Sequence, residues 1–295
     1  MRVLVLGPTG QLGTDVVRVL RERGEDVLPA TRQLADLTDR PAIDALLARE
    51  RPDAVVNCAA FHDVAGCEVN PELAFAVNAT GVESLAQQCA KIGAKLMTVS
   101  SDYVFDGTKV GGYREEDVPN PVNRYGESKL AGEQLALAAH AQTFVVRTQS
   151  LFGLAGPSGK GFNFVDLMIK LSEERDEIKV DQFRMAPTGT ASLAENMYTL
   201  LLTDDFGVYH MSCQGETTWY EFAQAILKGI GSQTKATPVS NDYYPTTFMR
   251  PENTYLINAR LQARALDQMP HWEQALAEYL QAKGVTRAPA VRGSR

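Results

Sequence analysis

Short apolar segments alternate with helical segments along the first half of this chain, and this alternation restricts the fold more than any other feature. Residues Val3–Leu6 form an unbroken apolar run, and Gln11–Arg23 has apolar residues at helical spacing before Gly24. The pattern continues through Asp26–Ala30, Pro41–Glu50, Ala54–Cys58, Pro71–Ile92, Lys95–Ser100, Val122–Ala139 and Thr143–Arg147. Continuously apolar strands separated by helices predict an α/β fold with a doubly wound parallel sheet, which binds ligands at the carboxyl ends of its strands.

After residue 150 the alternation is less regular. It predicts helices at Phe164–Glu174, Trp219–Leu227, Ala259–Leu266 and Trp272–Ala282, a strand at Val208–Ser212, and loops at Asp181–Gly189 and Ser232–Pro251. We therefore predict a Rossmann-like dinucleotide-binding domain (1–150) and a smaller C-terminal substrate-binding lobe (151–285), with strand or helix returns to the main domain allowed. The Pro- and Arg-rich tail 286–295 is expected to be disordered.

Composition excludes several classes of function. The 295 residues are 44% hydrophobic, which is enough for a large core, and the net charge of −7 comes without clustered basic residues. We therefore expect no nucleic-acid surface. The four cysteines lack C-x-x-C spacing, and with only four histidines no metal site is expected. Scattered thiols, no apolar run of about 20 residues and no leader sequence favour a cytoplasmic protein without a membrane segment.

A glycine-rich loop separates the first strand from the first helix. The sequence Gly7-Pro-Thr-Gly10-Gln-Leu-Gly13 lets the backbone turn tightly and approach a pyrophosphate, while the helix N-terminus supplies N–H groups and a positive dipole. The spacing differs from G-x-G-x-x-G, and a plain glycine-rich turn is the alternative. Its position after an apolar strand favours a phosphate-binding loop.

The end of the second strand bears on the choice of cofactor. An acid at this position binds a free ribose 2′-hydroxyl, but the chain reads Ala30-Thr31-Arg32-Gln33 there. Arg32 could instead meet a 2′-phosphate, and a solvated arginine is the alternative. Asp36 and Leu37 are then expected near the adenine.

A serine, a tyrosine and a lysine form the candidate catalytic group. Tyr125 and Lys129 are four residues apart on one helix face, and Ser101 ends the preceding strand. A free tyrosine has a pKa of about 10, and we expect the lysine ammonium to lower it towards neutrality. Such a trio suits proton transfer to a carbonyl oxygen. The alternative is a core-capping tyrosine beside a solvated lysine.

With these pieces in order, the chain closely resembles the extended short-chain dehydrogenase/reductases and, within them, the dTDP-4-dehydrorhamnose reductase family. The resemblance runs from Met1 to about Leu280. It rests above all on two motifs, Val99-Ser-Ser-Asp-Tyr-Val-Phe-Asp-Gly107 and Tyr125-Gly-Glu-Ser-Lys129-Leu-Ala-Gly-Glu133. The family reduces the 4-keto group of a nucleotide-linked 6-deoxyhexose with NADPH or NADH, forming dTDP-L-rhamnose.

The resemblance implies a role for each matching residue. Tyr125 would donate the proton, Lys129 would tune it and hold the nicotinamide ribose, and Ser101 would bind the developing alkoxide. The motifs and the resemblance together predict as cofactor-binding residues Gly7, Gly10, Gln11, Leu12, Gly13, Arg32, Asp36, Leu37, Ala59, Ala60, Tyr125 and Lys129. The resemblance implies Ser101, Asp102 and Tyr103 as substrate-binding residues, with Ser150 at a position of the sugar pocket. Arg250 is added because a chain of net charge −7 needs a local cation to hold a diphosphate.

Ser150 departs from the family pattern, and the role of Arg250 has alternatives. The family often has tryptophan where this chain has Ser150, so a flat ring is missing from the expected sugar pocket. Arg250 is expected at the substrate diphosphate, with a surface arginine or a loop-holding ion pair as alternatives. Another nucleotide keto-sugar remains an alternative substrate. A non-catalytic subunit resembling the methionine adenosyltransferase β subunit, and a homodimer, also remain open.

Overall fold

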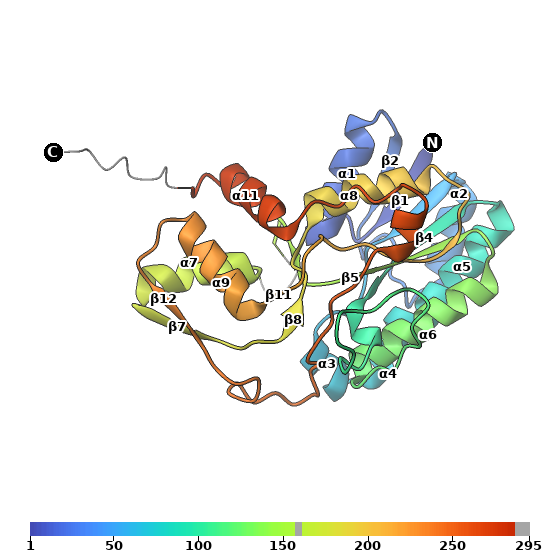
Figure 1. Cartoon of the computed structure of the whole chain (residues 1–295). Helices are drawn as coiled ribbons and strands as arrows, with labels where there is room; N and C mark the ends of the chain where they lie inside the picture. Colours follow the sequence, from blue (N-terminus) through green and yellow to red (C-terminus); the bar gives the residue numbers. More distant parts are fainter. Residues whose placement is uncertain (157–160, 287–295) are drawn as a thin grey trace.

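The computed structural model describes residues 1–156 and 161–286 of the chain. Its centre is a six-stranded sheet in the order β2-β1-β3-β4-β5-β10, with every neighbouring pair parallel (Figure 1). The strands are β1 (Arg2–Leu6), β2 (Asp26–Ala30), β3 (Ala54–Asn57), β4 (Lys95–Ser101), β5 (Thr143–Thr148) and β10 (Gly207–His210). The order reverses at β1, and doubly wound sheets bind ligands at such a switch point. The predicted doubly wound sheet is confirmed.

Alternate residues of β1 explain why helices cover both faces of this sheet. Val3 and Val5 pack into one apolar cluster, whereas Leu4 and Leu6 pack into another. The covering helices are α1 (Gln11–Glu22) and α8 (Thr190–Leu201) on the first face, and α2 (Arg40–Glu50), α5 (Gly81–Ile92) and α6 (Arg124–Ala139) on the second. The two faces hold separate parts of the core.

The chain after β5 contributes to two places. Helix α8 and strand β10 return to the main sheet, as the sequence allowed, whereas α7, α9 and a small sheet gather to one side (Figure 1). The elements on that side are α7 (Phe164–Glu174), β7 (Glu177–Val180), α9 (Trp219–Gly229), β12 (Lys235–Pro238) and α11 (Trp272–Ala282). Short strands lie between the two parts: β6 (Leu151–Phe152), β8 (Arg184–Met185), β9 (Thr188–Gly189) and β11 (Thr217–Thr218). Helix α10 (Ala259–Ala263) packs against β10.

The segment Pro71–Ile92, predicted as one helix, differs from that prediction. It comprises α4 (Pro71–Phe75), a π-helical turn (Ala76–Thr80) and α5, and an unpredicted α3 (Val64–Val69) precedes it. The π turn directs Asn78 to the loop after β3, where its side chain bonds the backbone N and O of Phe61 at 2.8 and 2.9 Å. A Cβ on Gly132 of α6 would lie 2.0 Å from the Asn78 carbonyl oxygen. Close packing with α6 and the loop bonds therefore accompany the extra residue in this turn.

Several predicted boundaries in the second half also need correction. The predicted loop 232–251 contains β12, which pairs in parallel with β7, and the predicted loop 181–189 contains β8 and β9. The predicted strand at 208–212 is β10, which ends at His210, and the predicted helix at 259–266 ends at Ala263. These short elements depend on partners distant in sequence, so local periodicity does not mark them. The predicted disordered tail lies, beyond residue 286, outside the described residues.

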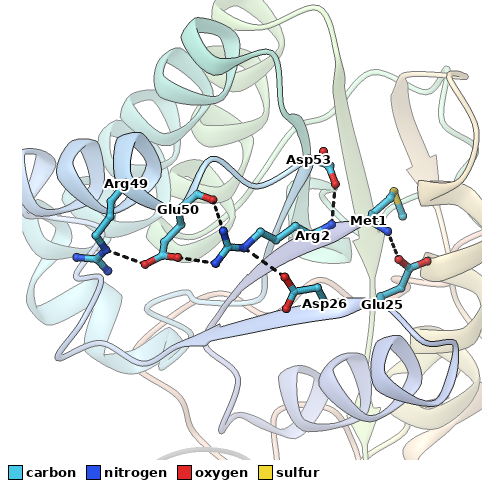
Figure 2. Close-up of polar contacts among 7 residues, drawn as sticks. All are labelled: Met1, Arg2, Glu25, Asp26, Arg49, Glu50 and Asp53. Atoms are coloured by element: carbon cyan, nitrogen blue, oxygen red, sulfur yellow. Dashed lines mark hydrogen bonds and ion pairs between the residues drawn. The ribbon is translucent and has the colours of Figure 1, made fainter.

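Charged residues cluster at the amino edge of the sheet, opposite the carboxyl ends of its strands (Figure 2). Arg2 pairs with Glu50 at 2.8 Å and with Asp26 at 3.4 Å, and its backbone N–H donates to Asp53 at 2.6 Å. The N-terminal amine pairs with Glu25. This edge is therefore occupied by ion pairs within the chain, which leaves the carboxyl edge as the place for a ligand.

Candidate active site

A cavity of about 780 Å³ runs along the carboxyl edge of the six-stranded sheet. Segments that follow five of the strands, β1 to β5, contribute to its wall. The wall includes most residues predicted for the site, namely Gly7, Gly10, Gln11, Leu12, Gly13, Arg32, Asp36, Leu37, Ala59, Ala60, Ser101, Asp102, Tyr125, Lys129 and Ser150. Tyr103 and Arg250 are not part of this wall. Residues spread over half of the sequence therefore meet at one edge of the sheet.

The glycine-rich loop has the geometry that a phosphate requires. Gly7 has a φ of +69°, and a Cβ there would lie 3.0 Å from the backbone N of Ala59. A Cβ on Gly13 would lie 2.0 Å from the Gly7 carbonyl oxygen, so the helix can approach the loop only with glycine. Gly10 is the N-cap of α1 and offers no side chain to cap it. The first-turn N–H groups thus face the cavity without a side-chain cap, which fits a bound pyrophosphate.

The side chain of Gln11 serves the loop after β5. Its Nε2 donates to the Leu151 carbonyl at 3.0 Å, and its Oε1 accepts from the Gly153 N–H at 3.1 Å and from Asn163 Nδ2 at 3.2 Å. These bonds tie the start of α1 to the segment after β5. Because the side chain is engaged there, the phosphate-binding role predicted for Gln11 depends on its backbone N–H.

Arg32 and Asp36 lie at the β2 end of the cavity. Arg32 Nε donates to Asp36 Oδ2 at 2.8 Å, and the Arg32 side chain is 79% exposed. Hydrogen bonds from the Thr38 backbone and from Arg32 lower the pKa of Asp36 to about 2, so this carboxylate is ionised. An exposed guanidinium held by an ionised acid can turn to a 2′-phosphate with little desolvation cost.

Ser101 and Asp102 lie where β4 passes into a short 3₁₀ turn (Asp102–Val104). The Ser101 hydroxyl donates to Asp102 Oδ1 at 2.9 Å and accepts from the Tyr103 N–H at 3.2 Å. Asp102 is buried, and burial raises its pKa to about 6, with hydrogen bonds from Thr254 and Ser101 opposing the rise. A buried acid that titrates near neutrality on a cavity wall is typical of a functional site.

Tyr125 and Lys129 project from successive turns of α6 into the same cavity. The Asn123 side chain caps this helix through the Gly126 N–H at 2.9 Å, which fixes where the first turn begins. Lys129 Nζ donates to the Val99 carbonyl of β4 at 2.7 Å, and burial lowers the pKa of Lys129 to about 8. Helix α6 thus holds both side chains against the end of β4.

The expectation that Lys129 lowers the pKa of Tyr125 is wrong for this structure. Burial raises the pKa of Tyr125, and an interaction with the Ser101 hydroxyl opposes the rise only in part. Burial of the Tyr125 hydroxyl is the largest cause of the rise, while the Lys129 ammonium donates its hydrogen bond to the Val99 carbonyl. Tyr125 is therefore protonated at neutral pH and can donate a proton.

Arg250 lies beside Tyr103, away from the main cavity wall. Arg250 Nη1 pairs with Asp181 Oδ2 at 2.8 Å, and its guanidinium carbon lies 3.9 Å from the centre of the Phe183 ring. Burial raises the pKa of Tyr103 to about 12, and the neighbouring Arg250 opposes the rise. The Tyr103 ring also meets the Tyr125 ring edge-on at 5.8 Å. The ion pair considered as an alternative role for Arg250 is thus present. It lies beside Tyr103, the residue that follows Asp102.

The structure adds residues that the sequence did not single out as functional. Asn78 connects the loop after β3 to Ser128 of α6 through a bond of 3.0 Å. Glu133 forms a buried ion pair with Arg147 at 2.6 Å, one turn beyond Lys129. Thr148 and Gln149 line the cavity beside Ser150, which has a φ of +46°. The arginine at the end of β5 is visible in the sequence, but its burial and its pairing with Glu133 are visible only in the fold.

The doubly wound sheet, the uncapped glycine-rich loop and the Ser, Tyr and Lys at one cavity place the chain in the class of extended short-chain dehydrogenase/reductases. The chain belongs to the family described as "RmlD substrate binding domain", whose sequence model matches residues 1–284.

Relatives of this chain cover nearly its whole length. It is 36% identical over 281 residues to dTDP-4-keto-6-deoxy-D-glucose reductase of Streptomyces niveus, covering 94% of this chain and 96% of that protein. A dTDP-4-dehydrorhamnose reductase of Clostridium acetobutylicum superposes with a TM-score of 0.92 at 33% identity, covering 96% and 100% of the two chains. The Bacillus anthracis dTDP-4-dehydrorhamnose reductase, solved with NADP, has a TM-score of 0.91 at 34% identity, covering 95% and 99%.

Proposed function

We propose that this protein reduces the 4-keto group of a nucleotide-linked 6-deoxyhexose with NADPH or NADH, converting dTDP-4-dehydro-L-rhamnose to dTDP-L-rhamnose. The observation that carries the proposal is the meeting of Ser101, Tyr125 and Lys129 in one cavity with an uncapped phosphate-binding loop. Relatives named for this reduction span 92% or more of their own length with this chain, which supports the same assignment.

The proposed chemistry divides between cofactor and protein. The reduced nicotinamide supplies a hydride to the carbonyl carbon. Tyr125 donates its proton to the carbonyl oxygen, and its raised pKa keeps that proton available at neutral pH. Ser101 donates a hydrogen bond to the same oxygen as negative charge develops. Lys129 holds the nicotinamide ribose and, when protonated, stabilises the tyrosinate left after transfer.

We propose that Asp102, Tyr103, Ser150 and Arg250 contact the substrate, and that residues 151–285 supply its lobe. Asp102 lies on the cavity wall, and Arg250 lies next to Tyr103. Arg250 is the cation we assign to the diphosphate, because guanidinium binds such oxygens in bidentate fashion and Asp181 holds it ready. The 2′-phosphate of NADPH is assigned to Arg32.

A second substrate is favoured by one residue. Ser150 leaves the sugar pocket without the flat ring that the family often has, and the Streptomyces niveus relative is named for a keto sugar of different configuration. dTDP-4-keto-6-deoxy-D-glucose is therefore the second candidate. Both substrates use the same hydride and proton transfers, so the choice concerns the pocket and leaves the catalytic residues unchanged.

We place the reaction in the cytoplasm and propose a homodimer as the assembly. Among residues 1–156 and 161–286, no helix has both the length and the apolar character to cross a bilayer.

The non-catalytic alternative is a regulatory subunit, which would bind the nucleotide cofactor without turning over any keto sugar.

A substrate panel separates these functions. The purified protein is incubated with NADPH or NADH and with dTDP-, GDP- and UDP-linked 4-keto sugars, cofactor oxidation is followed by absorbance, and products are identified by NMR. We expect turnover with a dTDP-linked sugar and a defined configuration at C4. Cofactor binding without oxidation of any sugar in the panel would favour the regulatory alternative.

A further inference from the structure

The end of β5 carries polar atoms that lack partners. Thr148 Oγ1 and both amide atoms of Gln149 have no hydrogen-bond partner within residues 1–156 and 161–286. Thr148 is 4% exposed and Gln149 is 2% exposed, so bulk water has little access to form the missing hydrogen bonds. An unpaired buried amide is costly, and such groups in native proteins call for an explanation. Both residues line the cavity, so a ligand there is the explanation we pursue.

The location of these atoms along the cavity identifies the part of the ligand. Arg32 and Asp36 lie at the β2 end, the uncapped helix lies at the switch point beside β1, and Thr148 lies at the β5 end. A dinucleotide with its pyrophosphate at the helix N-terminus extends in both directions from that point. With adenine at the β2 end, nicotinamide falls at the β5 end, where Ser101 and Thr148 are paired across the two strands.

We propose that Gln149, with Thr148, binds the carboxamide of the nicotinamide ring. A primary carboxamide has one acceptor oxygen and an NH₂ donor, and the Gln149 amide has the same two groups and can pair with it reciprocally. The Gln149 amide atoms are covered by protein in this structure, so the proposed contact requires the side chain to change rotamer when the cofactor binds. This inference rests on the proposed nicotinamide-dependent function.

Fixing the carboxamide has a consequence for the reaction. The two faces of the nicotinamide ring exchange when the ring rotates half a turn about its bond to the ribose. A carboxamide held by Gln149 prevents that rotation and keeps one face towards Tyr125 and Ser101. Gln149 is thus a positioning residue that determines which face of the ring meets the substrate carbonyl.

The test compares two cofactors that differ only at this group. Dissociation constants of NADPH and of its 3-acetylpyridine analogue, in which methyl replaces NH₂, are measured by calorimetry for wild type and Gln149→Leu. We expect wild type to prefer NADPH by about tenfold, the effect of one hydrogen bond, and Gln149→Leu to bind the two within about twofold. Thr148→Val is a second variant, with a smaller loss of preference expected.

Two controls make the result specific. Gln88→Leu removes another buried glutamine whose Nε2 lacks a partner among the described residues, on α5 and outside the cavity wall, and should retain the wild-type preference. ADP-ribose, which has no nicotinamide, should bind Gln149→Leu as it binds wild type.

An unchanged preference in Gln149→Leu, or no preference in wild type, overturns the proposal. If wild type prefers NADPH and Gln149→Leu does not, but no keto sugar is reduced, the reductase assignment fails while the carboxamide contact is supported. If wild type binds neither cofactor, both fail.

Discussion

Helix α6 carries two buried polar groupings one turn apart, and they differ in how their charges are compensated. At Glu133, Arg147 donates from Nε at 2.9 Å and from Nη2 at 2.6 Å, and both side chains are at most 4% exposed. At Lys129, the one hydrogen-bond acceptor among the described residues is the neutral Val99 carbonyl, and the pKa of the amine falls to about 8. Asp102, which lines the same cavity as Lys129, has its pKa raised to about 6 by burial.

The difference teaches which grouping serves the fold and which serves a ligand. A carboxylate that faces a bidentate guanidinium is compensated within the chain. Lys129 and Asp102 are desolvated without an equivalent partner, which lowers stability and leaves both groups able to respond to a bound charge or a proton. We infer that the Glu133–Arg147 pair holds β5 against α6. We infer that Lys129 and Asp102, in contrast, find their partners in the bound substrate and cofactor.

The largest effect expected is on turnover. Tyr125→Phe removes the hydroxyl that we propose as the proton donor, and little else. General acid catalysis is typically worth about 10²–10⁴-fold, so kcat should fall by that factor while NADPH affinity and the unfolding free energy change little. Steady-state kinetics and urea denaturation measure the two. Tyr198→Phe, which removes a hydroxyl bonded to Glu25 at 2.8 Å far from the cavity, should leave kcat unchanged.

The largest effect on stability is expected at the buried Glu133–Arg147 ion pair. Glu133→Ala leaves the Arg147 guanidinium buried without its carboxylate and should lower the unfolding free energy by about 3–5 kcal/mol. Glu127→Ala on the same helix removes an exposed pair with Arg124 and should cost at most about 1 kcal/mol. Denaturation curves of both variants test this. Equal losses would contradict the distinction between buried and exposed pairs.

Asp102→Asn should show a pH-dependent gain in stability. The pKa of Asp102 rises from 3.8 to about 6 on folding, so the folded state binds more protons between these values. Its contribution to the unfolding free energy therefore falls as pH rises through this window, by about 3 kcal/mol in total. The variant should match wild type near pH 4 and exceed it at neutral pH. Asp106→Asn should be less stable than wild type at neutral pH, because Tyr113 and Thr108 lower the pKa of Asp106, and this difference should shrink as pH falls below about 4.

The smallest effect concerns the other end of the cavity. Arg32→Ala should weaken NADPH by about three- to tenfold and leave NADH almost unchanged, since an exposed guanidinium meeting a phosphate contributes modestly. Calorimetry with both cofactors measures the ratio. Equal affinities in wild type, with no selective loss in the variant, would show that Arg32 does not bind the 2′-phosphate.

The sequence was sufficient for the main sheet because its strands are apolar and its helices are periodic. Strand β2 and helices α7 and α11 occur at the predicted residues. The glycine-rich loop and the Tyr125–Lys129 spacing are likewise local patterns. Local patterns did not predict α3, β8, β9, the π turn at Ala76–Thr80 or strand β12. The π turn packs against α6 and β12 pairs with β7, so both depend on contacts distant in sequence.

Electrostatics could be predicted only in part. Sequence spacing correctly puts Tyr125 beside Lys129 on one helix face, but the sign of the tyrosine pKa shift depends on burial, which only the fold supplies. The same holds for Gln149, whose unpaired amide becomes visible once the end of β5 is seen to be buried. Residue identity indicates which groups can react, and packing determines their protonation.

The most direct test of the account follows the hydride. Wild-type protein is given dTDP-4-dehydro-L-rhamnose and NADPH carrying deuterium at C4 of the nicotinamide, in one stereochemical form and then in the other, and the product is analysed by NMR. The account predicts deuterium at C4 of the product sugar from one form only, with Tyr125→Phe forming little product. No deuterium at C4 from either form, in protein that binds NADPH, would contradict the proposed reduction.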